Sequence, residues 1–258
     1  MTSPCVLLSV LRFGGKMNRN EKLGEAEINP EGSFFRWFDN FWYHHKWKTI
    51  IVSFFAIVVL VCTLQMCTSE KEDITFVYAG KAYLSANDVD NIEKVLEYVM
   101  PEDFDGNGEK ATVLVNYQIY SEEQIKDIEK EHPGEDIGLY IDRSFNSNNY
   151  DEFYKYMQTG ETSVCFLDPS LFNSMSENNR LLELSEALGY TPENSVDGYG
   201  IRLGDLEIYN EYSVLKALPE DTVVCILRSL VVGKNSKPKM YAQEMDMFCA
   251  IVEFGDEK

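Results

Sequence analysis

The feature that most constrains this chain is an uncharged and almost wholly apolar run of 19 residues, Thr49–Cys67. At about 1.5 Å per residue, a helix of this length measures roughly 28 Å, close to the thickness of the hydrocarbon core of a bilayer. We therefore predict one transmembrane helix over residues 49–67. It separates a tail of residues 1–48 from a domain of residues 68–258, and the lipid bilayer is the first expected partner.

Aromatic and basic side chains precede this run. The three tryptophans of the chain are Trp37, Trp42 and Trp47, and basic residues accompany them at Arg36, Lys46 and Lys48. The residues that follow the run, 69–73, are mostly acidic. Tryptophan collects at membrane interfaces, and basic residues remain on the cytoplasmic side. The pattern predicts an uncleaved signal-anchor in the cell membrane, with the N-terminus in the cytoplasm and the C-terminal domain outside the cell.

Two other interpretations of the segment stay open. A cleaved signal peptide would have a shorter apolar stretch nearer the N-terminus. A lipoprotein signal ending at Cys67 would need small residues where the chain has Gln65 and Met66. The start of the chain is open as well, because Met17 begins an ordinary polar tail. Translation starts at Met1 or at Met17, and in the second case residues 1–16 are not translated.

The charge of the C-terminal part argues against nucleic acid as a partner. Seven of the 23 Lys and Arg residues and five of the 43 Asp and Glu residues precede Thr49, which leaves a net charge of about −22 on the rest. Such a surface repels polyanions. About 190 residues, rich in aliphatic and aromatic side chains, suffice for a folded domain with its own core.

The domain contains three cysteines, an odd number for a disulfide framework. Cys165, Cys225 and Cys249 each lie in an apolar run. We interpret them as buried free thiols that pack as small hydrophobic side chains. One disulfide together with one free thiol is the alternative.

Apolar runs typical of strands alternate with helical periodicity along the domain. Strands are predicted at 74–78, 112–119, 164–167 and 223–227, whereas residues 137–141 fit a short strand or a helix start. Helices are predicted behind capping signals at Ser85 and Ser121, from Asn149, from Pro169 and from Pro238. Short apolar strands between amphipathic helices predict an α/β domain, with a mixed or largely parallel sheet covered by helices on both faces.

One acidic loop resembles the first half of a calcium-binding loop. Asp103, Asp105 and Asn107 place oxygen ligands at positions 1, 3 and 5, with Gly106 at position 6. Position 12 is Leu114, where a calcium loop needs a bidentate Glu, so a complete EF-hand is excluded. The favoured interpretation is a tight helix-to-strand turn, which uses the same residue types for their backbone geometry. A weak calcium site is the alternative.

No arrangement typical of catalysis stands out. His132 is the only histidine of the domain, which argues against a Ser-His-Asp triad and against a multi-histidine zinc site. The sequence contains no glycine-rich phosphate loop, and its carboxylates are too numerous to single out an acid–base pair. We expect a protein that is not an enzyme and needs no cofactor.

One segment carries a family resemblance. A helical stretch that ends in Gly160-Glu161 leads into the apolar strand 163–167 and then into a second helix at 168–172. This succession resembles the crossover segment of type 2 periplasmic solute-binding proteins. Over residues 34–258 the layout also resembles uncharacterised single-span membrane proteins of Firmicutes. The resemblance implies a type 2 periplasmic-binding fold, shorter than most two-lobed receptors and anchored by a helix rather than a lipid.

Two strand ends are the candidate ligand cleft, because ligands of open α/β sheets bind at the carboxyl ends of the strands. The residues there are Tyr78, Ala79 and Gly80 after the first strand and Leu167, Asp168 and Ser170 after the third. Strand-to-helix turns without a ligand account for them equally well. We expect an extracytoplasmic module that binds an unidentified small molecule. The alternative is a pocketless protein-interaction or regulatory module of an envelope complex.

Overall fold

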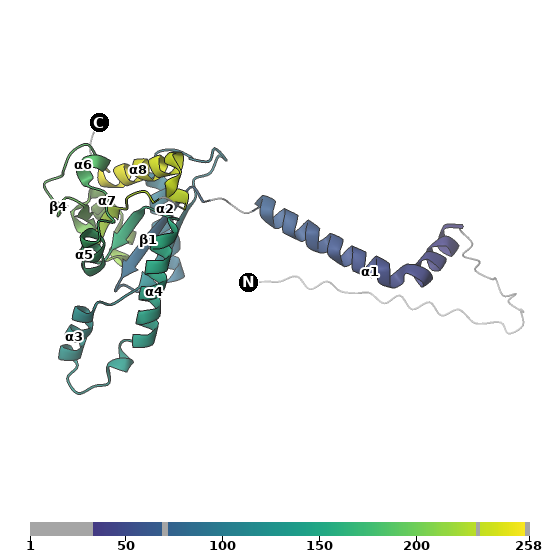
Figure 1. Cartoon of the computed structure of the whole chain (residues 1–258), viewed down its shortest axis with the longest axis horizontal. Helices are drawn as coiled ribbons and strands as arrows, with labels where there is room; N and C mark the ends of the chain where they lie inside the picture. Colours follow the sequence, from purple (N-terminus) through teal and green to yellow (C-terminus); the bar gives the residue numbers. More distant parts are fainter. Residues whose placement is uncertain (1–32, 69–71, 231–232, 256–258) are drawn as a thin grey trace, which may run out of the picture. The chain divides into compact units, whose positions relative to one another are not determined.

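The computed structural model describes residues 33–68, 72–230 and 233–255. The chain forms two compact units, residues 1–69 and residues 70–258 (Figure 1). Helix α1 belongs to the first unit, and the α/β domain is the second. The candidate translation start at Met17 lies outside the described residues.

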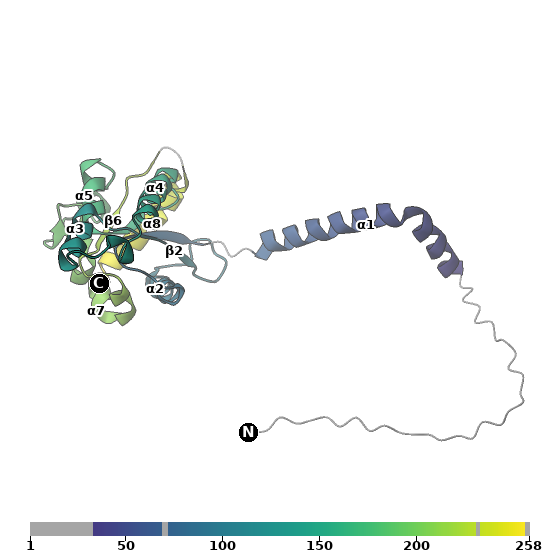
Figure 2. The ribbon, with the colours of Figure 1, turned by 90° about the horizontal axis from the view of Figure 1, so that it is seen from below.

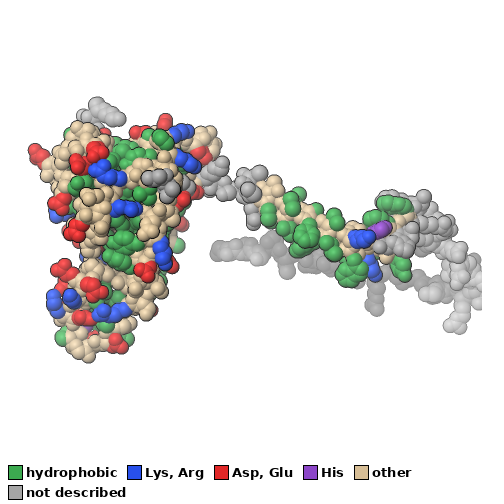
Figure 3. Space-filling model, in the orientation of Figure 1, with side chains coloured by type: hydrophobic (Ala, Val, Ile, Leu, Met, Phe, Trp, Pro, Cys, Tyr) green, Lys and Arg blue, Asp and Glu red, His purple; other side chains and the backbone are tan. Residues whose placement is uncertain are grey.

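Helix α1 spans Ser33–Thr68 and so begins well before the predicted transmembrane helix. Its stretch His45–Thr63 is long and apolar enough to cross a membrane, and it is the only such stretch in the part of the chain that the structure describes. None of that stretch is buried by other parts of the protein, and hydrophobic side chains cover the helix in Figure 3. Near its start the rings of Trp37, Phe41 and His45 contact one another at four-residue spacing.

The domain is built on one six-stranded sheet with the order β2-β1-β3-β6-β5-β4. The strands are β1 (Ile74–Gly80), β2 (Thr112–Gln118), β3 (Val164–Leu167), β4 (Ser195–Val196), β5 (Gly200–Arg202) and β6 (Val223–Ile226). β1 pairs in parallel with β2 and with β3. The pairs β3–β6, β5–β6 and β4–β5 are antiparallel. The domain is therefore α/β with a mixed sheet, as the sequence predicted.

The four strands predicted from the sequence do not include β4 and β5. Asp197 and Gly198, between them, both have a positive φ, 51° and 76°. Consecutive residues in this region are typical of the tight turns that join antiparallel strands. The two strands are only two and three residues long. That is too short to show the alternation by which a strand is recognised in a sequence.

Helices cover both faces of the sheet. Because successive side chains of a strand point to opposite sides, β1 contributes to the core on each face. Phe76 and Tyr78 belong to a core that includes residues of α2 and α8, whereas Val77 and Ala79 belong to a second core with α4 and α5. The helices are α2 (Ala86–Val99), α4 (Arg143–Thr159), α5 (Pro169–Glu177) and α8 (Pro238–Val252). Figure 2 shows α2 and α4 on opposite sides of β2.

Most helix starts follow the local signals in the sequence. The capping boxes of Ser85 in α2 and of Ser121 in α3 (Glu122–Glu131) are confirmed, and Asp168 caps α5 with Pro169 in its first turn. The predicted start of a helix at Asn149 is wrong, because α4 already begins at Arg143 behind the cap Asp142. Its first turns are polar and exposed and so carry no apolar periodicity.

The remaining elements are short. Residues 137–141 contain the 3-10 helix η1 (Ile137–Leu139) rather than a strand. The others are α6 (Leu184–Ala187), η2 (Leu203–Asp205), α7 (Glu207–Glu211), η3 (Ser213–Ala217) and η4 (Lys234–Ser236).

Candidate functional site

A pocket of about 320 Å³ lies beside the ends of β2 and β3, between α3, the first turns of α4 and the start of α5. Figure 1 shows α3 and the N-terminal end of α4 extending beyond the sheet on this side. The pocket is lined mainly by polar side chains: Tyr120, Ser121, Glu122, Ile125, Arg143, Asn146, Ser147, Tyr150, Asp151 and Ser170.

Helix α4 is tied to the end of β2 by two asparagines. The side chain of Asn146 donates to the carbonyl oxygen of Tyr120 at 3.0 Å and accepts from the amide of Tyr120 at 2.8 Å. The side chain of Asn149 donates to the carbonyl oxygen of Gln118 at 2.9 Å. These bonds satisfy backbone groups that no neighbouring strand reaches. They also hold Tyr120 and Asn146 in place as one wall of the pocket.

The caps of α3 and α5 are joined to each other beside the pocket. Asp168 accepts from the amide and the hydroxyl of Ser170, at 3.0 and 2.8 Å, through one oxygen. Its other oxygen accepts from the side-chain amide of Gln124 at 2.8 Å. The side-chain oxygen of Gln124 in turn accepts from the amide of Ser121 at 2.9 Å. Asp168 is buried, and all of these contacts hold the starts of two helices together.

The structure separates the six residues predicted for the cleft. Ser170 lines the pocket, whereas Ala79 and Leu167 are fully buried in the core beneath α4 and α5. Tyr78 is also buried, and its hydroxyl accepts from the amide of Ala82 at 3.0 Å. Burial raises the pKa of Tyr78 well above its usual value, and the nearby charge of Asp168 acts in the same direction. A Cβ atom on Gly80 would meet both the Tyr78 hydroxyl and the Cβ atom of Asp168.

The residues that the sequence reasoning missed lie after the second strand. Tyr120 and Ser121 follow β2, and Arg143, Asn146 and Tyr150 belong to α4. The rule that ligands bind at the carboxyl ends of parallel strands applies to β2 as it does to β1 and β3. By that rule the sequence also predicts residues 119–121 as positions at the ligand-binding edge of the sheet. The contribution of α4 was not predicted, because the helix was expected to begin at Asn149.

The pocket offers hydroxyl groups and charges of both signs. Arg143 forms an ion pair with Glu129 at 2.6 Å, and the acidic residues Glu122 and Asp151 also line the pocket. The hydroxyl of Tyr150 lies 3.4 Å from that of Tyr154. Burial and then this hydrogen bond raise the pKa of Tyr150 to about 12, so it is a neutral hydroxyl at physiological pH. This lining suits a polar ligand.

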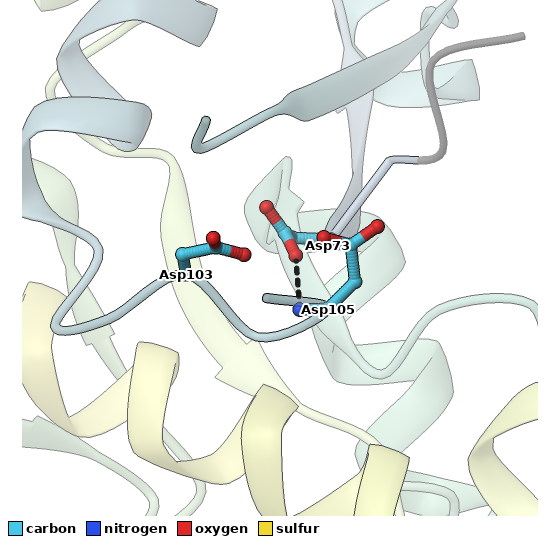
Figure 4. Close-up of side chains that lie close together, drawn as sticks. All are labelled: Asp73, Asp103 and Asp105. Atoms are coloured by element: carbon cyan, nitrogen blue, oxygen red, sulfur yellow. Dashed lines mark hydrogen bonds between the residues drawn. The ribbon is translucent and has the colours of Figure 1, made fainter. Parts of the chain in front are cut away.

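A second group of side chains lies at the amino end of β1. Asp73, Asp103 and Asp105 each present a carboxylate oxygen within 4.8 Å of the other two (Figure 4). Asp73 was not predicted as a member of this group. Asn107, which was, lies in the same loop, where its side-chain oxygen accepts from the amide of Glu109 at 2.7 Å. Asp73 accepts from the amide of Asp105 at 2.9 Å and from the amide of Ala111 at 3.1 Å.

The carboxylates of this acidic cluster also accept hydrogen bonds from the loop that carries them. Asp103 accepts from the amides of Gly106 and Gly108 at 2.7 and 2.6 Å, and Asp105 accepts from that of Asn107 at 2.9 Å. These bonds, first that from Gly108, lower the pKa of Asp103 below its usual value. The acidic side chains therefore close a turn around two glycines of positive φ.

The two groups of residues differ in what they offer a ligand. The pocket has walls from three helices and the polar lining described above. The acidic cluster consists of partly or fully exposed carboxylates already engaged by backbone amides.

Comparison with protein families, with curated proteins and with solved structures finds no match to this chain.

Proposed function

We propose that this protein is a membrane-anchored binding module that holds a small polar molecule in the pocket between α3, α4 and α5. The observation that supports the proposal most is the position of the pocket. It lies at the carboxyl ends of two strands of the parallel half of the sheet, where α/β proteins bind their ligands.

The size and lining of the pocket limit the ligand. Small-molecule sites measure about 300–1,000 Å³, and this pocket of about 320 Å³ lies at the lower end of that range. A single amino acid or monosaccharide fits such a volume. The hydroxyls of Ser121, Ser147 and Tyr120 and the charges of Arg143 and Asp151 favour a polar ligand over an apolar one.

The proposal extends to the fold relationship of the domain and to its side of the membrane. The parallel strands β1–β3, covered on both faces, support a relationship with type 2 solute-binding proteins. Because the described residues of the domain form a single sheet, the relationship would be to a reduced, one-lobed version. Helix α1 would be the anchor. Lys46 and Lys48, at the start of its apolar stretch, favour an N-terminus in the cytoplasm and a domain outside the cell.

Scanning calorimetry of the full chain in detergent micelles tests this function. Calorimetry is preferable to tryptophan fluorescence, because all three tryptophans belong to α1 and none to the domain. The compounds are the proteinogenic amino acids, short peptides, and mono- and disaccharides. A ligand at one hundred times its Kd adds about 2.7 kcal/mol to the free energy of unfolding. We expect one of these classes to raise the Tm of the domain, and an unchanged Tm with every compound would contradict the proposal.

A second candidate function is supported by the residues that extend beyond the sheet. Residues 120–147, termed the arm, contain eight acidic and three basic residues. The arm leaves large apolar side chains in solvent, since Leu139 is 76% and Phe145 is 54% exposed. Exposed apolar patches rimmed by polar residues mark protein contact sites. We propose that the arm docks a basic segment of another envelope protein.

Photo-crosslinking in native membranes tests the second candidate. A photoreactive amino acid replaces Leu139 in the arm or, as a control, Tyr83, which is equally exposed at 76% but lies outside the arm. A docking arm predicts one discrete crosslinked product from position 139 that is absent from position 83. Equal products from both positions, or none from position 139, would contradict it.

A further inference from the structure

The two cysteines of the sheet face each other across a strand pair. In the antiparallel pair of β3 and β6, Cys165 lies directly opposite Cys225. Both side chains are completely buried, in the core beneath α4 and α5. Both are free thiols in the structure. The pairing of β3 with β6 makes the two cysteines neighbours, although they are far apart in the sequence.

The register of the strands sets the distance between them. The amide of Leu227 donates to the carbonyl oxygen of Ser163 at 2.8 Å. The pattern of an antiparallel ladder repeats every two residues, so Cys165 and Cys225 also form a hydrogen-bonded pair, with Cα atoms about 5.5 Å apart. A disulfide accepts Cα separations of about 4.4–6.8 Å. The backbone of this pair is therefore compatible with a bridge.

Such a bridge would be strained. Directly opposed Cβ atoms in a sheet lie about 4.5–5.5 Å apart, whereas a disulfide holds them at about 3.5–4.5 Å. Closing the bond must draw β3 and β6 together within a packed core. Strained disulfides are more easily reduced than relaxed ones. The geometry thus favours a bond that opens and closes over one that is permanent.

We propose that Cys165 and Cys225 are a redox-sensitive pair that closes reversibly into a cross-strand disulfide through exchange with a small-molecule disulfide. With oxidised glutathione, the thiolate of one cysteine attacks the glutathione disulfide, and one reduced glutathione leaves. The thiolate of the second cysteine then attacks the mixed disulfide, and a second reduced glutathione leaves. The protein loses two electrons and two protons, which the two glutathione molecules gain.

The environment of the pair decides when exchange occurs. Burial, first of all, and then the neighbouring Cys225 and Glu244 raise the pKa of the Cys165 thiol well above its usual value. The reactive species in exchange is the thiolate, which a packed core disfavours. The bond therefore forms while the sheet is assembling or transiently open. This inference is independent of the proposed ligand pocket.

Cys249 provides the matched control. It belongs to α8, which packs on the opposite face of the sheet, and its thiol donates to the carbonyl oxygen of Ala187 at 3.7 Å. A disulfide that formed by chance in an unfolded domain would involve Cys249 at least as readily, because Cys249 is closer to Cys225 in the sequence than Cys165 is. A disulfide that depends on the register of β3 and β6 would not involve it.

Peptide mapping of the refolded chain tests the inference. The full chain and the variant Cys249→Ala are reduced and unfolded, then refolded in detergent with oxidised and reduced glutathione in several ratios. Free thiols are then alkylated in denaturant, so that buried thiols also react, and the protein is digested with trypsin without reduction. In the oxidising mixtures, we expect peptide 156–180, with Cys165, to be joined to peptide 217–228, with Cys225, with the loss of two hydrogen masses. The more reducing mixtures should return both as alkylated peptides while the domain stays folded.

Three results would overturn the inference. The first is alkylation of both cysteines in every mixture. The second is a bond to peptide 240–258, which contains Cys249, in place of the expected one. The third is a Cys165–Cys225 bond that opens only when the domain unfolds. The variant Cys165→Ala should leave peptide 217–228 unlinked. If that variant does not fold, the wild type and Cys249→Ala still decide the question.

Discussion

The hydroxyl oxygen of Tyr78 lies 2.8 Å from the position that a Cβ atom on Gly80 would occupy. Real Cβ atoms almost never come so close to another heavy atom. The same Cβ would lie 3.3 Å from the Cβ atom of Asp168. The buried tyrosine therefore reaches the amide of Ala82 only because residue 80 has no side chain, and the glycine fits the end of β1 against the cap of α5.

The variant Gly80→Ala should be less stable than the wild type. The added methyl group displaces the Tyr78 ring or the Asp168 cap, and such overpacking costs about 1–3 kcal/mol. Calorimetric unfolding of the full chain measures the loss. Gly138→Ala is the control, because its Cβ would meet only the exposed carboxylate of Asp136, at 3.2 Å. We expect the control to change stability by less than about 0.5 kcal/mol. Equal losses in the two variants would contradict the packing described for Gly80.

The domain should lose stability at alkaline pH because the fold raises the pKa values of several tyrosines, most of all those of three. Burial raises the pKa values of Tyr78, Tyr150 and Tyr156 above those of unfolded tyrosine, and that of Tyr150 reaches about 12. Between pH of about 10 and 12 the unfolded chain binds fewer protons than the folded one, so the free energy of unfolding falls as pH rises. Below pH of about 10 the contribution is fully present.

Denaturant unfolding at a series of pH values measures this fall, and tyrosinate absorbance reports the titration directly. The variant Tyr150→Phe should show a smaller fall between pH of about 10 and 12 than the wild type does. A free energy of unfolding that stays level across this range would show that the three phenols are not protected by the fold.

The local signals in the sequence were sufficient for much of the parallel half of the domain. A capping box such as Ser85 with Asp88 is complete within four residues, and an apolar run such as that of β1 needs no knowledge of its neighbours. The antiparallel half was harder to predict. β4 and β5 are too short for a pattern, and only the pairing of β6 with β3 and β5 shows the direction of the strands.

The candidate site was less predictable than the fold. Ser121, Asn146 and Ser170 come from three separate segments that only the tertiary structure brings together. Asp73 joins Asp103 and Asp105 across a gap of about thirty residues for the same reason. The packing of helices also decides which residues of a strand face a pocket. Here it buries Ala79 and Leu167 in the core rather than in the pocket.

The acidic cluster should show no binding of calcium in the millimolar range. Its carboxylates accept backbone amides of their own loop, and no Glu is present at position 12 of the motif, where a calcium loop needs a bidentate ligand. Titration calorimetry of the full chain with calcium chloride measures this. We expect only the heat of dilution, for the wild type and for Asp103→Asn alike. A saturable heat that is lost in Asp103→Asn would identify a calcium site instead of a turn.

The proposed topology predicts the outcome of protease treatment. Cells stripped of their outer layers and treated with protease should lose the domain of residues 70–258 and retain a small N-terminal fragment in the membrane. The same protease added to sealed, inverted membrane vesicles should remove the N-terminal tail. Full protection of the domain in intact cells would contradict the topology. A mature protein that begins after Cys67 would show that the anchor is cleaved.

If the pocket between α3, α4 and α5 binds a small polar molecule, filling the pocket must abolish binding, and one matched pair of variants measures this. Ser147→Trp fills the pocket, whereas Asn148→Trp places the same side chain on the next residue of α4, which does not line it. The measurement is the rise in the Tm of the domain with the amino acids and sugars named above. We expect a rise for one compound class in the wild type and in Asn148→Trp, and none in Ser147→Trp. An equal rise in all three proteins, or no rise in any of them, would contradict it.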